Sequence, residues 1–272
     1  MPRNISFPDF LRAVAIPMFG FAIVNPMGPT FMGFAIGKSK SGNASLIFFS
    51  LNPFNQLAEE ITEYNFDPHT VDHDSMLTKY GICFDIDKSL VEEKIDLFND
   101  SSLLLTGYEI PLEVTNHSLN LAKKKGLRTI LNPAPYFEND KEVFKLVDYL
   151  TPNEHEASSL TKVSVKSIDD ARLAGQKICE LGVGTSIITL GEKGVLCTRG
   201  VDDQDGLYFP SFKIKDEVID TVGAGDVFNG AFATGISEGM SLEYALEFAN
   251  KAASLSVRKA GAALSAPYRN QF

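Results

Sequence analysis

The sequence is short of cysteine and of clustered basic residues, and these shortages exclude several kinds of protein. Its three cysteines, Cys83, Cys179 and Cys197, stand far apart, without the paired spacing of a zinc site or the density of a disulfide scaffold. A reducing compartment fits best, so we expect a cytoplasmic protein. The formal net charge of −10 would repel a phosphate backbone, and no basic run carries interleaved aromatic residues, so nucleic acid is not an expected partner.

Charge is also missing from residues 13–37, which follow Arg3 and Arg12 as the core of a signal or a membrane anchor would. A membrane-spanning helix needs roughly 20 predominantly apolar residues. Three prolines and four glycines interrupt this stretch. We therefore expect no membrane association, with export or anchoring as the alternative.

Hydrophobic residues make up 44% of the 272 residues, enough for one large α/β domain or two small ones. From about Lys88 onward, short β-rich runs alternate with amphipathic helical stretches, which is typical of parallel strands joined by crossover helices. The pattern predicts strands at 102–108, 127–133, 148–153, 185–191 and 194–200. It predicts helices at 112–126, 139–147, 167–182, 225–239 and 241–261, the third opened by a Ser-x-x-Asp cap.

The first 87 residues follow no such alternation. Residues 45–50 and 80–87 favour strands, but the material between them is irregular and polar. We treat residues 1–87 as a divergent N-terminal region and residues 88–272 as the core. The two are expected to form one continuous domain.

The segment Asp-Thr-Val-Gly-Ala-Gly-Asp, residues 220–226, joins a glycine turn to a helical pattern. Small residues let the backbone turn tightly and aim successive N–H groups into one small volume, and such a concavity at a helix N-terminus holds anions. Asp226 fits there as a base that takes a proton from a substrate hydroxyl. The amides of Gly223, Ala224 and Gly225 would stabilise charge on a transferring phosphoryl group. The alternative is that Asp226 only caps the helix.

This segment resembles the C-terminal signature of the ribokinase-like, or PfkB, family of carbohydrate kinases, and the resemblance extends over roughly residues 100–267. It implies a three-layer αβα sandwich with a mostly parallel central sheet and a small, incomplete β-lid. It also implies ATP-dependent phosphorylation of a sugar, with D-ribose as the closest match. Related enzymes pair through that lid, so the resemblance implies a homodimer to the extent that the lid is complete.

Three further motifs resemble segments of the family. Those that close two central strands are Leu-Asn-Pro-Ala-Pro at 131–135 and Thr-Pro-Asn-Glu-His-Glu-Ala at 151–157, and the one that lies along the nucleotide is Ile-Thr-Leu-Gly-Glu-Lys-Gly-Val at 188–195. Glu156 is implied to order magnesium through water, which suits a hard cation that keeps its water ligands. Without the family, these motifs would be a capped surface helix and a hairpin turn. The residues implied to contact ATP are Asn153, Thr189, Leu190, Gly191, Glu192, Lys193, Gly194, Gly225 and Asn250.

The tail Ser-Val-Arg-Lys-Ala-Gly-Ala-Ala-Leu-Ser, residues 256–265, resembles the loop that holds a monovalent cation in ribokinases, and potassium suits it. The alternative is an ordinary glycine-containing loop. The implied ligands, mostly through carbonyl oxygens, are Asp220, Val222, Ser256, Lys259, Gly261 and Ser265.

On the sugar side, Glu109 occupies the place of an acidic residue that touches the sugar in the family, or else it is a solvated loop residue. His69 and His73, with Asp72 and Asp74, are more typical of a solvated loop than of a metal site.

The N-terminus departs from the family. Residues 1–40 lack the usual strand aspartate and Gly-Gly motif of the sugar pocket, and residues 41–49 resemble a later strand of the lid. The alternative to a ribose kinase is therefore a truncated relative that binds nucleotide without sugar kinase activity, or a kinase of another sugar or a nucleoside.

Overall fold

The computed structural model describes residues 87–99, 101–138, 141–213, 217–260, 265–267 and 269–271, together with the backbone of three short strands near the N-terminus. Those strands are β1 (Phe21–Ile23), β2 (Gly37–Lys38) and β3 (Ala44–Ser45). Most of residues 13–37, most of the two strands expected at 45–50 and 80–87, and the 69–74 polar stretch lie outside the described residues.

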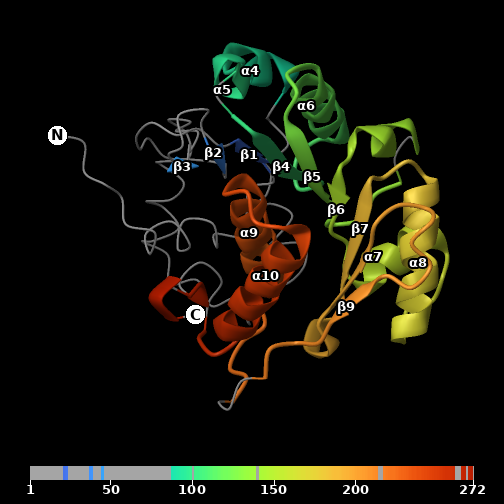
Figure 1. Cartoon of the computed structure of the whole chain (residues 1–272). Coiled ribbons are helices and arrows are strands. Elements are labelled where there is room, and N and C mark those ends of the chain that lie inside the picture. Colours follow the sequence, from blue (N-terminus) through green and yellow to red (C-terminus); the bar gives the residue numbers. More distant parts are fainter. Residues whose placement is uncertain are drawn as a thin grey trace, which may run out of the picture.

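A sheet in the order β1-β4-β5-β6-β7-β8-β9 forms the centre of the described chain (Figure 1). Strands β4 to β7 are parallel, whereas β1, β8 and β9 run antiparallel to their neighbours. Separately, β2 and β3 pair in an antiparallel two-stranded sheet. The core strands are β4 (Leu103–Gly107), β5 (Arg128–Asn132), β6 (Tyr149–Leu150), β7 (Thr185–Thr189), β8 (Val195–Thr198) and β9 (Leu207–Phe209).

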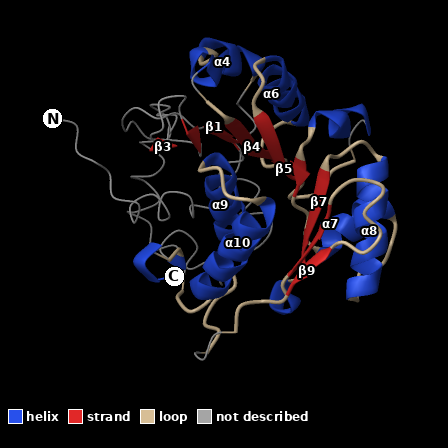
Figure 2. Ribbon diagram, viewed as in Figure 1, coloured by secondary structure: helices blue, strands red, loops and turns tan. Residues whose placement is uncertain are grey.

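Helices cover both faces of this sheet, with α6, α7 and α8 on one side and α9 and α10 on the other (Figures 1 and 2). This layering confirms the α/β sandwich predicted from the alternating pattern. The helices are α4 (Lys88–Glu93), α5 (Asp96–Asn99), α6 (Leu112–Lys124), α7 (Glu154–Thr161), α8 (Ile168–Glu180), α9 (Ala224–Ser237) and α10 (Leu242–Ser256).

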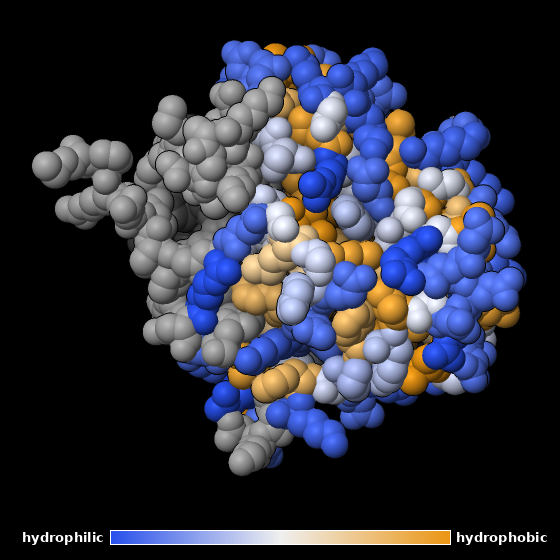
Figure 3. Space-filling view, viewed as in Figure 1, coloured by the Kyte–Doolittle hydropathy of each residue, from blue (hydrophilic) through white to orange (hydrophobic). Residues whose placement is uncertain are grey.

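Burial explains why the central strands are so apolar. Leu104, Ile130 and Ile187 are fully buried because helices lie on both faces of the parallel strands. Helix α9 is buried from Val227 to its end at Ser237, since it lies between the sheet and α10. On the face seen in Figure 3, hydrophilic residues gather over the outer helices α4, α6 and α8, and more hydrophobic residues gather around α9 and α10.

Local signals predicted some helix ends correctly and others not. Ser167 caps α8, and Asp170 completes a capping box, as the Ser-x-x-Asp pattern predicts. The helix expected at 139–147 is instead the 3₁₀ helix η2 (Lys141–Leu146). Helix α10 ends at Ser256 rather than at 261, and the Val257 carbonyl accepts hydrogen bonds from the N–H groups of Ile219 and Asp220.

Two short helices, α4 and α5, were not predicted. Helix α4 begins where the Asp87 carboxylate accepts a hydrogen bond from the Leu90 backbone at 3.0 Å. Within the described part of the chain, no helix combines the length and the hydropathy that crossing a bilayer requires.

Candidate active site

The carboxyl ends of the parallel strands bring several predicted residues to one edge of the sheet. Glu109 follows β4, Asn153 follows β6, and Thr189 ends β7. Asn153 and Thr189 form a parallel bridge, and the Thr189 N–H donates to the Pro152 carbonyl at 3.0 Å. In open α/β sheets this edge is where ligands bind.

Asp226 lies in the first turn of α9, directly after the glycine turn. Gly223 adopts φ 77°, a left-handed conformation that favours glycine, and it precedes the helix as its N-cap. The Gly223 carbonyl accepts from the Val227 N–H at 2.9 Å, whereas the Ala224 N–H donates to the Thr221 carbonyl at 3.2 Å. Of the three amides predicted to stabilise a phosphoryl group, the one at Ala224 is therefore already engaged.

Two carboxyl groups here, Glu109 and Asp226, are partly buried, and the charge of Asp226 acts on Glu109. Burial, reinforced by repulsion from Asp226, raises the pKa of Glu109 to about 8. Burial raises the pKa of Asp226 to about 6, against a lowering by its own backbone N–H. Glu109, predicted from the sequence only as a sugar-side acid, thus lies close enough to Asp226 to interact with it electrostatically.

Glu156, the predicted outer-shell magnesium residue, belongs to the capping box of α7. Its two carboxylate oxygens accept from the backbone N–H and the Nδ2 of Asn153, both at 2.8 Å. Burial raises the pKa of Glu156, these hydrogen bonds lower it, and Asp226 adds a smaller upward push. Asp226 therefore influences both Glu109 and Glu156, which places carboxylates from three elements around one region.

No group of three or more His, Cys, Asp or Glu side chains within the described ranges is arranged to hold a metal ion directly. The His117 Nε2, in that part of the chain, lies 2.7 Å from Glu92 Oε1. Carboxylate oxygens nevertheless suit magnesium when water lies between, so Glu156 fits the outer-shell role only.

The predicted nucleotide turn, residues 189–194, forms the 3₁₀ helix η3 (Gly191–Lys193) between β7 and β8. The Leu190 N–H donates to the Gly194 carbonyl at 2.8 Å, which closes the turn. The Lys193 Nζ lies 3.3 Å from Glu154 Oε1 and so ties the turn to the start of α7. Glu192 is exposed beside them.

Asn250, predicted near the adenine, lies on α10 and donates from Nδ2 to the Pro210 carbonyl at 2.7 Å. Two side chains that the sequence did not single out contact the nucleotide turn: Tyr208 and Ser211 donate to its Lys193 and Glu192 carbonyls. Only the register of the β8–β9 hairpin reveals these contacts.

Asn229 was also missed. It lies one turn beyond Asp226 on α9, is 6% exposed, and its Oδ1 has no hydrogen-bond partner in the structure as described. The sequence shows it only as a polar residue within an apolar helix.

Some of the residues predicted to bind a monovalent cation lie near one another. Ile219 and Asp220 both donate their N–H to the Val257 carbonyl, at 2.8 and 3.2 Å, which places Asp220 beside the end of α10 that carries Ser256. Asp220 Oδ1 accepts from the Val222 N–H at 2.9 Å. Gly261 lies outside the described residues.

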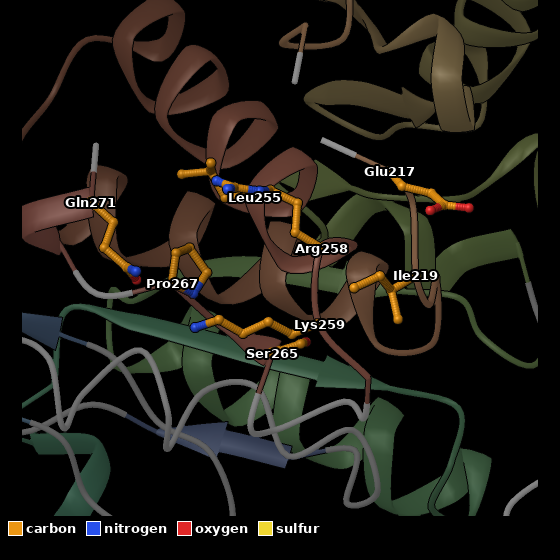
Figure 4. A pocket seen from close by; sticks show the side chains of 8 residues that line it. All are labelled: Glu217, Ile219, Leu255, Arg258, Lys259, Ser265, Pro267 and Gln271. Carbon is orange, nitrogen blue, oxygen red and sulfur yellow. The ribbon is translucent and has the colours of Figure 1, made fainter. Parts of the chain in front are cut away.

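A cavity of about 350 Å³ lies next to this group (Figure 4). Lys259 and Ser265, two of the predicted ligands, line it together with Ile219, the neighbour of Asp220. The residues around the cavity come from the end of α10, from the C-terminal segment and from the 217–219 segment: Glu217, Ile219, Leu255, Arg258, Lys259, Ser265, Pro267 and Gln271.

Comparison with known proteins identifies the family. The sequence profile described as "pfkB family carbohydrate kinase" matches residues 76–269. This chain belongs to the pfkB family of carbohydrate kinases. The resemblance drawn from the Asp-Thr-Val-Gly-Ala-Gly-Asp segment is therefore confirmed, and so is a phosphotransferase acting on a sugar hydroxyl.

Several of the similar proteins are ribokinases. The chain is 32% identical to the ribokinase of Haemophilus influenzae over 238 residues, which is 87% of this chain and 76% of the relative. It is 31% identical to the Arabidopsis thaliana ribokinase solved with ribose and ATP (TM-score 0.61, 65% of this chain and 56% of that one). It is 32% identical to Thermotoga maritima ribokinase (TM-score 0.61, 90% of this chain and 70% of that one). These likenesses support an ATP-dependent sugar kinase of the ribokinase type.

Proposed function

We propose that this pfkB family member transfers the γ-phosphoryl group of ATP to the primary hydroxyl of D-ribose. The observation that carries the proposal is the position of Asp226, partly buried in the first turn of α9 and within electrostatic reach of Glu109 and Glu156. Glu109 and Glu156 follow two strands that end at the same edge of the sheet. A base, a sugar-side acid and a nucleotide-side acid thus meet at one place.

Asp226 takes the proton of the sugar hydroxyl as that oxygen attacks the γ-phosphorus. The new bond joins the sugar oxygen to phosphorus, the bond from phosphorus to the β–γ bridging oxygen breaks, and ADP leaves with that electron pair. A pKa of about 6 leaves the carboxylate ionised at neutral pH and more basic than an ordinary aspartate, which suits a general base.

The backbone at the start of α9 stabilises the negative charge of the transferring phosphoryl group. The Gly223 and Gly225 amides and the helix dipole provide positive partial charge there. The Ala224 N–H would have to share its bond to Thr221, which at 3.2 Å is long.

Glu109, in this proposal, binds the sugar hydroxyls, and Asn153, the 189–194 turn and Asn250 bind ATP. Magnesium, when bound, would neutralise phosphate charge, and Glu156 would hold its water ligands. A monovalent cation such as potassium would bind at Asp220 and the carbonyls of the other predicted ligands, of which Lys259 and Ser265 line the cavity.

We further propose that residues 1–87 and 88–272 form one domain. The pairing of β1 with β4 supports this, because a strand from the first part then extends the sheet of the second. A homodimer through the lid is also part of the proposal, and sedimentation of the purified chain tests it.

The test is ADP release from ATP and magnesium, with potassium present, for D-ribose and a panel of other sugars and nucleosides. Ribose-dependent turnover that is lost in Asp226→Asn supports the proposal. Turnover with another acceptor, and not with D-ribose, would identify that acceptor as the substrate instead. ATP binding by a folded chain without acceptor-stimulated turnover would instead identify a nucleotide-binding relative without kinase activity.

A further inference from the structure

Residues 208–212, which run from strand β9 into the segment after it, contact both parts of the proposed ATP site. The Tyr208 hydroxyl donates to the Lys193 carbonyl and the Ser211 hydroxyl to the Glu192 carbonyl, both at 2.6 Å. Two successive carbonyls of the 189–194 turn are thus fixed by side chains from outside the turn. We call residues 208–212 the strap.

The strap also lies directly against the backbone of the turn. Gly194 has φ 103°, and a Cβ at that position would lie 2.1 Å from the Phe209 carbonyl oxygen and 2.5 Å from the Ser211 nitrogen. Such an approach is open only to glycine. The pairing of Val195 with Phe209 in the β8–β9 hairpin sets this register.

On its other side the strap is bound by α10. Asn250 Nδ2 donates to the Pro210 carbonyl at 2.7 Å, and the Lys251 Nζ lies 5.0 Å from the centre of the Phe212 ring. Both contacts are favourable: the Asn250 amide donates to a carbonyl, and the Lys251 ammonium lies over the face of an aromatic ring. The strap therefore spans from the nucleotide turn to the residue proposed to lie near the adenine.

We propose that the strap positions the 189–194 turn and Asn250 relative to each other, with Tyr208 and Ser211 as positioning residues for ATP. This inference rests on the proposed function, since it takes the turn and Asn250 to be ATP contacts. Without the two hydroxyls, the turn keeps its internal hydrogen bonds and the Lys193 contact with Glu154, but its carbonyls are no longer held against the strap. The loss falls on nucleotide affinity rather than on the chemical step.

The experiment compares Tyr208→Phe, Ser211→Ala and Ser211→Thr with the unsubstituted chain. The matched control is Tyr244→Phe, which removes the same hydroxyl from a side chain on α10 that is 70% exposed. ATP affinity is measured by calorimetry, KM and kcat for the sugar by ADP release, and amide exchange of residues 191–194 by mass spectrometry.

We expect Tyr208→Phe and Ser211→Ala each to weaken ATP binding about three- to tenfold, as the loss of one hydrogen bond does. Amide exchange of the turn should accelerate, while KM for the sugar, kcat and Tm change little. Ser211→Thr restores a hydroxyl and should restore affinity, and Tyr244→Phe should match the unsubstituted chain.

Unchanged ATP affinity and unchanged exchange in both hydroxyl deletions overturn the strap proposal while leaving the kinase proposal intact. Equal losses in ATP affinity and in sugar KM overturn it too, because they indicate general loosening. If the unsubstituted chain binds no ATP, the kinase proposal fails and the strap's role toward ATP fails with it. That outcome is recognisable because it appears without any substitution.

Discussion

Asn153 and Glu156 are joined by three hydrogen bonds at the start of α7. Asn153 donates twice to the Glu156 carboxylate at 2.8 Å, and its Oδ1 accepts from the Glu156 N–H at 2.9 Å. Glu156 is only 8% exposed, so these bonds favour the charged form of a carboxyl that burial disfavours. Asn153 is therefore both the N-cap of α7 and a residue proposed to contact the nucleotide.

Asn153→Ala should therefore lower both stability and activity. Loss of a cap costs about 1 kcal/mol of unfolding free energy, and Glu156 loses the bonds that keep it ionised. The matched control is Ser167→Ala, which breaks the equivalent capping box with Asp170 on α8. Urea unfolding should show similar losses for both, whereas only Asn153→Ala should raise the magnesium concentration that half-activates turnover. If both variants change the magnesium dependence of turnover equally, Asn153 has no role beyond capping its helix.

Asp226→Asn should abolish most turnover without loss of ATP binding. Removing a general base costs on the order of 10² to 10⁴ in kcat. In the unsubstituted chain, kcat/KM should fall as the pH drops through about 6, because protonated Asp226 cannot accept the proton. Single-turnover rates across pH 5 to 8 measure this, and a rate that is flat across the range sinks the assignment.

Glu109 should make the folded chain less stable as the pH rises. Its pKa is raised from 4.5 to about 8, so the folded chain holds a proton that the unfolded chain releases. The stability it contributes is fully present below 4.5 and is lost as the pH rises through 8. Glu109→Gln should remove this dependence and raise the unfolding free energy at pH 8.5 by on the order of 1 kcal/mol or more.

Unfolding in urea at pH 5 and pH 8.5 checks the prediction for Glu109. Glu247→Gln, at an exposed position on α10, serves as the control and should leave the pH dependence unchanged. A Glu109 variant that loses stability at pH 8.5 would contradict the burial of this carboxyl.

Gly194→Ala should destabilise the chain far more than Gly200→Ala. Both glycines have positive φ, 103° and 89°, but only at Gly194 would a Cβ collide with backbone, at 2.1 Å from the Phe209 oxygen. Gly200→Ala should cost about 1 kcal/mol for left-handed backbone, and Gly194→Ala roughly 2 to 4 kcal/mol. Thermal unfolding measures both, and similar Tm losses would show that the hairpin shifts to relieve the contact.

Potassium should increase sugar-dependent turnover, and Asp220→Ala should reduce that increase. Asp220 Oδ1 accepts a hydrogen bond from the Val222 N–H at 2.9 Å, and Asp220 lies beside the end of α10. The substitution therefore removes both a negative charge and the hydrogen bond that supports the local turn. Turnover in potassium against lithium at equal ionic strength is the measurement. Asp202→Ala, at an exposed site between β8 and β9, is the control and should keep the full ratio.

The sequence predicts what depends on near neighbours along the chain. Ser167 and Asp170 are three residues apart, and the glycine turn lies immediately before Asp226, so a cap and a helix start could be read directly. The convergence of Glu109 with Asp226 depends on the order of strands in the sheet, which no local pattern encodes. The hydroxyl of Tyr208 meets Lys193 only because of the hairpin register. Helix α4 was missed because a short helix capped by Asp87 has little periodicity.

From β4 to β9 the strands lie side by side in the same order as in the sequence, and α9 follows all of them. A ribosome makes the chain from its N-terminus, and the early segments fold first. A nascent chain that has emerged as far as Asp220 already contains the edge and the turn assigned to ATP, but not Asp226. Such an unfinished chain can at most hold ATP, and hydrolysis or transfer must wait until translation has delivered the helix that carries the base.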